Sequence, residues 1–411
     1  MNTQRSNAPT LRRSTLVLPA LLAITACSAG CSTPSLDRAR HDFYAGRFQA
    51  ADQVLTKEEP TGNSRVLYLM ERGTIRQAEG HYEKSSKDFI EAFDILDRMA
   101  AVSVTKDTGS MVINDTVQDF KGAPFERTLL HTFTAKNHLA QANWVNAAVE
   151  ARRIIISLAP EQKSDYPDDA YSRYMAGFCL EMIDDDSNAA LQYREADEIS
   201  SVVHVDDRTG RLSSKTKSTD TNAPSAFVND PIDTFPWAQE LVCFVMTGRS
   251  PRGSDLQQGH RWAADTASFA EIRHEGQVLG RSYTLADTVD LAFTTEQKEA
   301  VRKMIKTAAR VAAKETIAHQ VEQNDELLGA LVRLVLIGML EQPDLRRWET
   351  LPRYLQVARV PCPPDLKEFD VVFKSSNGGE TGRQHITNPI THRRRMYVSF
   401  CRDIMPKRTS P

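Results

Sequence analysis

The sequence predicts an α+β protein, in which an N-terminal α-helical repeat solenoid precedes an α+β module with a helical hairpin. Two observations carry this prediction. In the first half, apolar residues recur at the 3.6-residue spacing of helices, in a phrase that returns after 34 residues. In the second half, short β-branched and aromatic runs replace that pattern. We expect an export signal at 1–30, a helical repeat domain at 31–200, a polar linker at 201–236 and an α+β domain at 237–405.

The N-terminus has the pattern of an export signal. Arg12 and Arg13 form a basic region, and an apolar region of 11 residues follows at 16–26, about half the length that spans a bilayer. Small residues then lead into Cys27 and again into Cys31. Both sites resemble the lipobox of bacterial lipoproteins, whose cysteine becomes the acylated first residue of the mature chain.

The resemblance leaves the acylated cysteine open between Cys27 and Cys31. Ile24 favours the first, whereas the small pair Ala29 and Gly30 favours the second. Cleavage before Cys31 also leaves four unmodified cysteines, an even number that suits an oxidising compartment. A serine after either cysteine implies, by this resemblance, transport to the outer membrane. We therefore expect acyl chains to anchor the protein there, facing the periplasm, and an ordinary secretory signal is the alternative.

The overall charge is nearly balanced, with 51 basic and 54 acidic residues and a net charge of −3. This balance leaves no electrostatic footprint for nucleic acid, and we expect no cofactor. The most apolar segment of the mature chain is 327–340, which is too short to cross a membrane and contains Arg333. We expect a buried helix there, with partner binding or insertion into a membrane interface as the alternative.

One copy of the repeat in the first half is clear. Its positions are Gly73, Gly80, Tyr82, Ser85, Phe89 and Ala92. This spacing resembles the tetratricopeptide repeat, in which the first glycine lets two helices approach and the second lies in the turn. Gly46 precedes Gly80 by 34 residues, the period of that repeat.

Three further copies are degenerate. They place Gly46, Asn143 and Asp184 in their turns, and the residues inserted before the third copy lie in a loop at 102–125. Four unrelated helical hairpins are the alternative. A solenoid presents a concave groove whose side chains are the default ligand contacts, so we expect an envelope protein partner there. The groove residues would be Met70, Gln77, Phe133, Asn137, Tyr171, Tyr174 and Glu181.

In the second half, alternating and β-branched runs predict strands. They lie at 240–247, 268–274, 277–283, 355–360, 367–373 and 395–401. Glu275 and Gly276 predict a hairpin turn, and residues 375–379 another turn. Thr295 is the predicted N-cap of a helix that runs to about residue 323 and pairs with the apolar helix after it.

Two phrases are similar to signatures of a family of bacterial envelope proteins with N-terminal tetratricopeptide-like repeats. One reads DLRRWETLP at 344–352 with LQVAR at 355–359, and the other joins Asn114 and Asp115 to FERTLLH at 125–131 and AKN at 135–137. The resemblance implies a lipoprotein and a link with regulation of peptidoglycan synthesis. It implies no reaction.

Catalytic motifs are missing from the sequence. The stretch His274-Glu275 does not continue as HExxH, the stretch from Gly248 lacks the second glycine of GxSxG, and no phosphate-binding loop is found. Cys243, Cys362 and Cys401 fall on or beside predicted strands of one module, so a disulfide between two of them is one expectation, whereas Cys179 is expected in the core.

A polar cluster in and after the inserted loop is the best candidate site. It consists of Asn114, Asp115, Glu126, Arg127 and His131. The structural alternative is that Asn114 and Asp115 tie the loop to helix ends and that Glu126 favours a helix N-terminus. We expect a non-catalytic scaffold of cell-envelope or peptidoglycan assembly. A cell-wall hydrolase or transferase with a site near Glu126 and His131 is the alternative.

Overall fold

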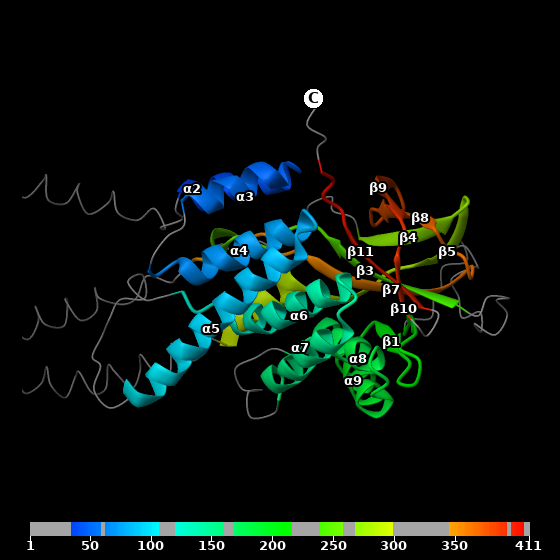
Figure 1. Cartoon of the computed structure of the whole chain (residues 1–411), viewed down its shortest axis with the longest axis horizontal. Coiled ribbons are helices and arrows are strands. Elements are labelled where there is room, and N and C mark those ends of the chain that lie inside the picture. The colour runs from blue at the N-terminus through cyan, green and yellow to red at the C-terminus, as the bar shows by residue number, and fades with distance from the viewer. Residues whose placement is uncertain are drawn as a thin grey trace, which may run out of the picture.

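The computed structural model describes residues 34–58, 62–106, 120–159, 168–215, 239–257, 268–298, 345–392 and 396–406. The signal peptide with Cys27 and Cys31, the loop residues Asn114 and Asp115, and the predicted helix at 327–340 lie outside these ranges. In Figure 1 helices follow one another along one side of the molecule, and the strands lie against them. The α+β class is therefore confirmed.

The first half consists of four consecutive helical hairpins. Their helices are α2 (Pro34–Tyr44), α3 (Phe48–Lys57), α4 (Arg65–Ala78), α5 (Tyr82–Lys106), α6 (Pro124–Ala140), α7 (Trp144–Ser157), α8 (Ala170–Glu181) and α9 (Asp186–Ile199). Each hairpin turn has one residue in the left-handed region, and Gly46 and Gly80 adopt φ of 75° and 87° as predicted. The third turn places Ala142 there, one residue before the predicted Asn143, whose side chain instead caps α7.

The predicted close approach of helices occurs at two glycines. A Cβ on Gly73 would lie 2.4 Å from the Phe89 ring, so α4 and α5 can meet there only with a hydrogen at that position. Gly177 has the same role in α8, where a Cβ would lie 3.0 Å from the Tyr193 ring. Two of the four hairpins, α4 with α5 and α8 with α9, are thus held by a ring packed on a glycine.

Part of the predicted linker is folded. Val203–Val205 (β1) and Leu212–Ser214 (β2) form an antiparallel hairpin against α9, with Val203 and Val205 buried. The prediction of a polar linker is therefore wrong for residues 203–215, because two alternating valines suffice to bury one face of a short hairpin. Residues 216–238 lie outside the described ranges.

Two sheets build most of the second half. Their strands are β3 (Gln239–Thr247), β4 (Phe269–His274), β5 (Gln277–Arg281), β6 (Tyr283–Asp287), β7 (Tyr354–Cys362), β8 (Glu368–Lys374), β9 (Glu380–Thr387), β10 (Ile390–His392) and β11 (Met396–Arg402). A five-stranded sheet has the order β10-β11-β3-β7-β6, and a four-stranded sheet the order β5-β4-β8-β9. All pairings are antiparallel except that of β11 with β3. A short helix, α10 (Gly253–Gln257), follows β3.

Three local predictions are corrected. The run at 277–283 divides at Ser282 into β5 and β6, which belong to different sheets, because the Ser282 hydroxyl accepts from Ala270 N and donates to Gln356. Thr295 is not an N-cap, since residues 288–298 are already helical and its hydroxyl bonds Leu291 O within that helix. Strands β9 and β10 were not predicted.

The hydrophobic core crosses from the helical half into the sheets. One cluster of buried side chains lies between the two sheets, with Leu241, Cys243 and Val371 among its members. A larger cluster joins the helices to the five-stranded sheet and contains Phe133 and Phe244 together. The two halves therefore share one continuous core. No helix within the described ranges is long and apolar enough to cross a membrane.

Candidate functional site

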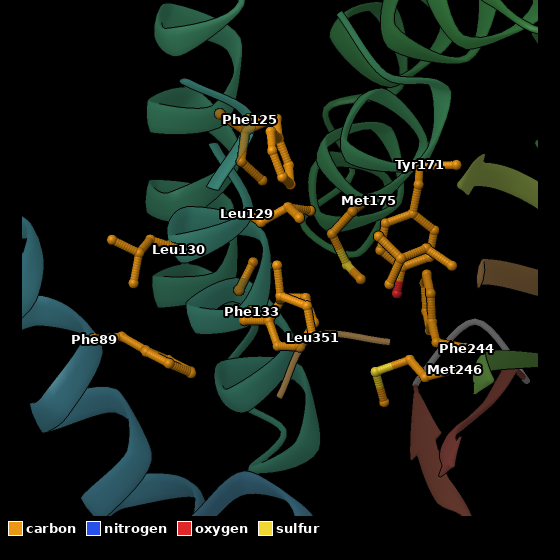
Figure 2. Close-up of a cluster of buried hydrophobic side chains, with 14 of the residues drawn as sticks. Phe89, Phe125, Leu129, Leu130, Phe133, Tyr171, Met175, Phe244, Met246 and Leu351 are labelled. Atoms are coloured by element: carbon orange, nitrogen blue, oxygen red, sulfur yellow. The ribbon is translucent and has the colours of Figure 1, made fainter. Parts of the chain in front are cut away.

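The inner face of the helical hairpins is covered by this chain's own sheet. Figure 2 shows Tyr171 of α8 directed towards the strand that carries Phe244 and Met246, and Phe133 of α6 beside Leu351 of the loop that precedes β7. The Tyr171 and Phe244 ring centroids lie 6.2 Å apart in an edge-on arrangement. This contact replaces the open groove that the repeat pattern predicts.

The residues predicted to line that groove are consequently buried, at 4% exposure or less for six of the seven. These six are Met70, Gln77, Phe133, Asn137, Tyr171 and Tyr174. The expectation that they contact a separate partner is wrong for this conformation. The five-stranded sheet and the loop before β7, both of the same chain, fill the space that the partner would occupy. The helical period identifies an inward face but does not identify what covers it.

A chain of polar side chains crosses this buried face. Lys136 Nζ donates to Gln77 Oε1 at 2.9 Å, and Gln77 Nε2 donates to Asn137 Oδ1 at 2.6 Å. Asn137 Nδ2 in turn donates to Ser85 Oγ at 2.8 Å. Burial lowers the pKa of Lys136 well below its usual value, and its other near contact is Met246 Sδ at 3.6 Å. The network therefore joins α4, α5 and α6 around a buried amine.

Trp348 inserts between the helices from the loop that precedes β7. Its side chain is fully buried, and its ring centroid lies 5.6 Å from that of Phe89 and 5.6 Å from that of Phe133. Its Nε1–H donates to Thr74 Oγ1 at 2.9 Å, and its backbone N–H donates to Glu126 Oε1 at 2.9 Å. The phrase DLRRWETLP thus supplies the anchor that joins the sheet half to the helices.

An ion-pair cluster beside Trp348 tightens the same junction. Arg40 Nη2 lies 2.6 Å from Glu71 Oε1, and Arg40 Nη1 lies 3.2 Å from Glu349. Glu71 also accepts from the backbone N–H groups of Glu349 and Thr350, at 2.9 and 3.1 Å. Burial is the largest influence on Glu349 and raises its pKa to about 7. Sequence reasoning missed Arg40 and Glu71, whose signal is a charge on an otherwise apolar helix face.

Glu181, the seventh predicted groove residue, is part of a second junction. Arg359 of β7 donates to Glu181 Oε1 at 2.9 Å and to Glu240 Oε2 at 2.9 Å. The nearby Tyr174 hydroxyl donates to Gly210 O at 2.8 Å. Glu181 therefore ties α8 to the sheet, and its carboxylate is already occupied within the chain.

The three described members of the polar cluster predicted as a site, Glu126, Arg127 and His131, have different partners. Glu126 accepts from Ala123 N at 2.6 Å and so caps α6, and burial raises its pKa. His131 Nδ1 lies 2.9 Å from Glu150 Oε2 between α6 and α7, and Arg127 Nε donates to Lys121 O at 2.9 Å. Glu126 and His131 thus have separate partners. The structural interpretation of Glu126 is the one that its contacts support.

The outer face of α7 is different in character from the buried inner face. Val145 is 69% exposed, Ile156 66% and Val149 40%, whereas Ala147 is buried. The third turn lies one residue earlier than the repeat pattern predicts, which turns Ala147 inwards and Val145 outwards. We call Val145, Val149, Arg152 and Ile156 the α7 stripe, since their spacing places them on one helix face.

Among the described residues, no group of three or more His, Cys, Asp or Glu side chains could hold a metal ion. No protein-family model matches the chain, and no curated protein matches it either. A crystal structure of nearly identical TPR-like repeats from Podosopora anserina, in a protein designated a kinesin light chain, matches with 15% identity and a TM-score of 0.30. The match covers 44% of this chain and 82% of that one.

Proposed function

We propose that this protein is a non-catalytic, protein-binding scaffold of the cell envelope, held at the outer membrane by acyl chains on Cys31 or Cys27. The export pattern and the paired lipobox-like sites support the location. Four consecutive helical hairpins support the scaffold, because stacked hairpins expose long helix faces at fixed spacing. The periplasmic setting makes cell-envelope or peptidoglycan assembly the process in which it takes part.

The observation that carries the proposal is the position of the exposed apolar side chains. In the described part of the chain, every large exposed apolar side chain lies on α5, α7 or α9, or directly after α9. These are Ile90, Val145, Val149, Ile156, Leu191, Ile199 and Val202. Because the inner face is already covered by the sheet, we assign partner binding to the outer face, centred on the α7 stripe.

The α7 stripe defines the chemistry of its partner. Arg152 lies between the aliphatic side chains and makes no ion pair with the described residues, whereas its neighbour Arg153 donates to Glu150 at 2.8 Å. An amphipathic helix with aliphatic side chains and a carboxylate opposite Arg152 would bury the stripe and neutralise this charge. A second copy fits less well, because a two-fold axis through the stripe would bring both Arg152 guanidinium groups together.

Site-specific photocrosslinking in intact envelopes tests the partner. A benzophenone amino acid at Val149 should give an adduct with another protein, whereas the same probe at the exposed, polar Asn188 of α9 should give none. Arg152→Glu should abolish the adduct and Arg152→Lys should retain it, and the crosslinked peptide should carry Asp or Glu beside aliphatic residues. A missing adduct, a dimer of this chain, a lipid adduct, or an adduct that Arg152→Glu leaves unchanged would each refute the assignment.

The anchor is tested separately. Intact-mass analysis of the mature N-terminus should find a diacylated or triacylated cysteine at Cys31, or at Cys27 if cleavage occurs earlier. Replacing the acylated cysteine by serine should then release the protein into the soluble periplasmic fraction, with the same replacement of the other cysteine as the matched control. An unmodified N-terminus produced by ordinary signal cleavage would overturn the lipid anchor without affecting the α7 stripe.

A further inference from the structure

Two thiols lie side by side in the core between the sheets. Cys243 Sγ of β3 and Cys401 Sγ of β11 are 3.3 Å apart, and their side chains are 0% and 1% exposed. Both thiols belong to the sheet-to-sheet cluster, with Leu241, Val245 and Val371, and Ser399 Oγ lies 4.0 Å from Cys401 Sγ. Cys179 and Cys362 are also buried, and neither has a thiol within hydrogen-bonding distance among the described residues.

The strand register explains why these two cysteines meet. β11 runs parallel to β3 with Ser399 opposite Cys243, and Cys401 follows two residues later on the same face of the sheet. The sulfur atoms need to approach by only about 1.2 Å to reach the bond length of a disulfide. Because β3 and β11 are 158 positions apart in sequence at these residues, a bond would close a long loop.

The geometry points to a Cys243–Cys401 disulfide in the exported protein. The C-terminal strand would be locked to the centre of the sheet, where Arg402 donates to Thr350 O and Asp403 accepts from Gly248 N at 2.8 Å. The bond thus supports the end of β11 that holds the helix-to-sheet junction. This inference rests on one part of the proposed function, the export of the chain. It does not depend on partner binding.

The oxidant is the disulfide of a thiol oxidoreductase or of a small thiol such as glutathione. One cysteine thiolate attacks the oxidant, forming a mixed disulfide and releasing the first thiol, and the second thiolate then attacks the mixed disulfide and releases the other. Two protons and two electrons leave the protein, and the oxidant is reduced to two thiols. Since both sulfur atoms are buried, the exchange takes place during folding, before β11 pairs with β3.

Peptide mapping of the full-length protein tests the bond. The protein is refolded from denaturant with reduced and oxidised glutathione, then unfolded and alkylated in denaturant without a reductant, and digested. We expect two of its core cysteines to resist alkylation and one crosslinked peptide to join Cys243 to Cys401. The urea midpoint of unfolding should fall when the protein is reduced. Cys243→Ser should lose the crosslink and the reductant dependence, whereas Cys362→Ser should keep both.

Refolding in vitro separates this inference from export, because it needs no secretion. Complete alkylation of Cys243 and Cys401 in the refolded protein, or a crosslink that involves Cys362 or Cys179 instead, would overturn it. If the refolded protein forms the bond but the protein isolated from cells is fully reduced, then the export assumed in the proposed function is wrong, while the geometric inference stands.

Discussion

Truncation of Trp348 should destabilise both halves of the molecule at once. The residue belongs to the loop before β7, yet its ring is enclosed by Phe89 and Phe133 of the helical half, each at a centroid distance of 5.6 Å. Because the two halves share one core, removing the ring leaves a cavity that neither half can close alone. Trp348→Ala is therefore the most direct test of the continuous core.

The expected loss of stability has two parts, the buried ring and its hydrogen bond. Removing a fully buried aromatic ring costs about 3–5 kcal/mol of unfolding free energy. Loss of the hydrogen bond from Nε1 to Thr74 Oγ1 adds about 1 kcal/mol, although Thr74 keeps its own donation to Met70 O. The backbone bond to Glu126 survives the substitution. Trp348→Phe keeps most of the ring and should cost only about 1–2 kcal/mol.

Urea unfolding followed by circular dichroism gives the total loss of stability, and hydrogen exchange with mass spectrometry locates it. Trp348→Ala should speed exchange in peptides of α4 and α6 and in peptides of β3 and β7 by a similar factor, because one cooperative core protects them all. If the strands lose protection while α4 and α6 exchange as in the wild type, then the halves unfold independently and the reasoning is wrong. Trp348→Phe is the matched control.

Three further variants probe the junctions and the helix contacts. Lys136→Met should remove a pH-dependent part of wild-type stability. The lowered pKa of Lys136 leaves the unfolded state binding more protons, so the free energy of unfolding of the wild type should rise with pH, by at most about 1.4 kcal/mol per pH unit, up to the ordinary lysine pKa of about 10.4; urea midpoints that change with pH in parallel in both proteins would contradict this. In the wild type, the raised pKa of Glu349 favours the protonated folded form, so the free energy of unfolding should fall by at most about 3 kcal/mol as pH rises from 4.5 to about 7. Glu349→Gln should abolish this fall, and equal pH profiles of the two proteins would contradict the prediction. Gly73→Ala should cost about 1–3 kcal/mol through the clash with Phe89, and Phe89→Leu should recover part of that loss in thermal melts.

Local sequence patterns were sufficient to predict most of the helices and strands. The 3.6-residue period predicts all four hairpins, and the turn glycines Gly46 and Gly80 have the positive φ that their positions require. The long strands β3, β7 and β11 follow from their β-branched runs. Strand β9 was missed because it lies at a sheet edge with alternate residues exposed, so its composition is polar and carries no apolar signal.

What the sequence by itself determined is the set of helices, the principal strands and the glycines that let helices touch, because these depend on neighbours within about 35 residues along the chain. Only the tertiary structure decided what those elements face. Periodicity marked Phe133 and Tyr171 as inward residues, but the residues that cover them, Trp348 and Phe244, are far away in sequence. The same holds for Glu126, whose second partner is the backbone of Trp348, and for Cys243, whose neighbour comes from the last strand. Contacts between distant segments depend on how whole layers pack, and no local pattern records that.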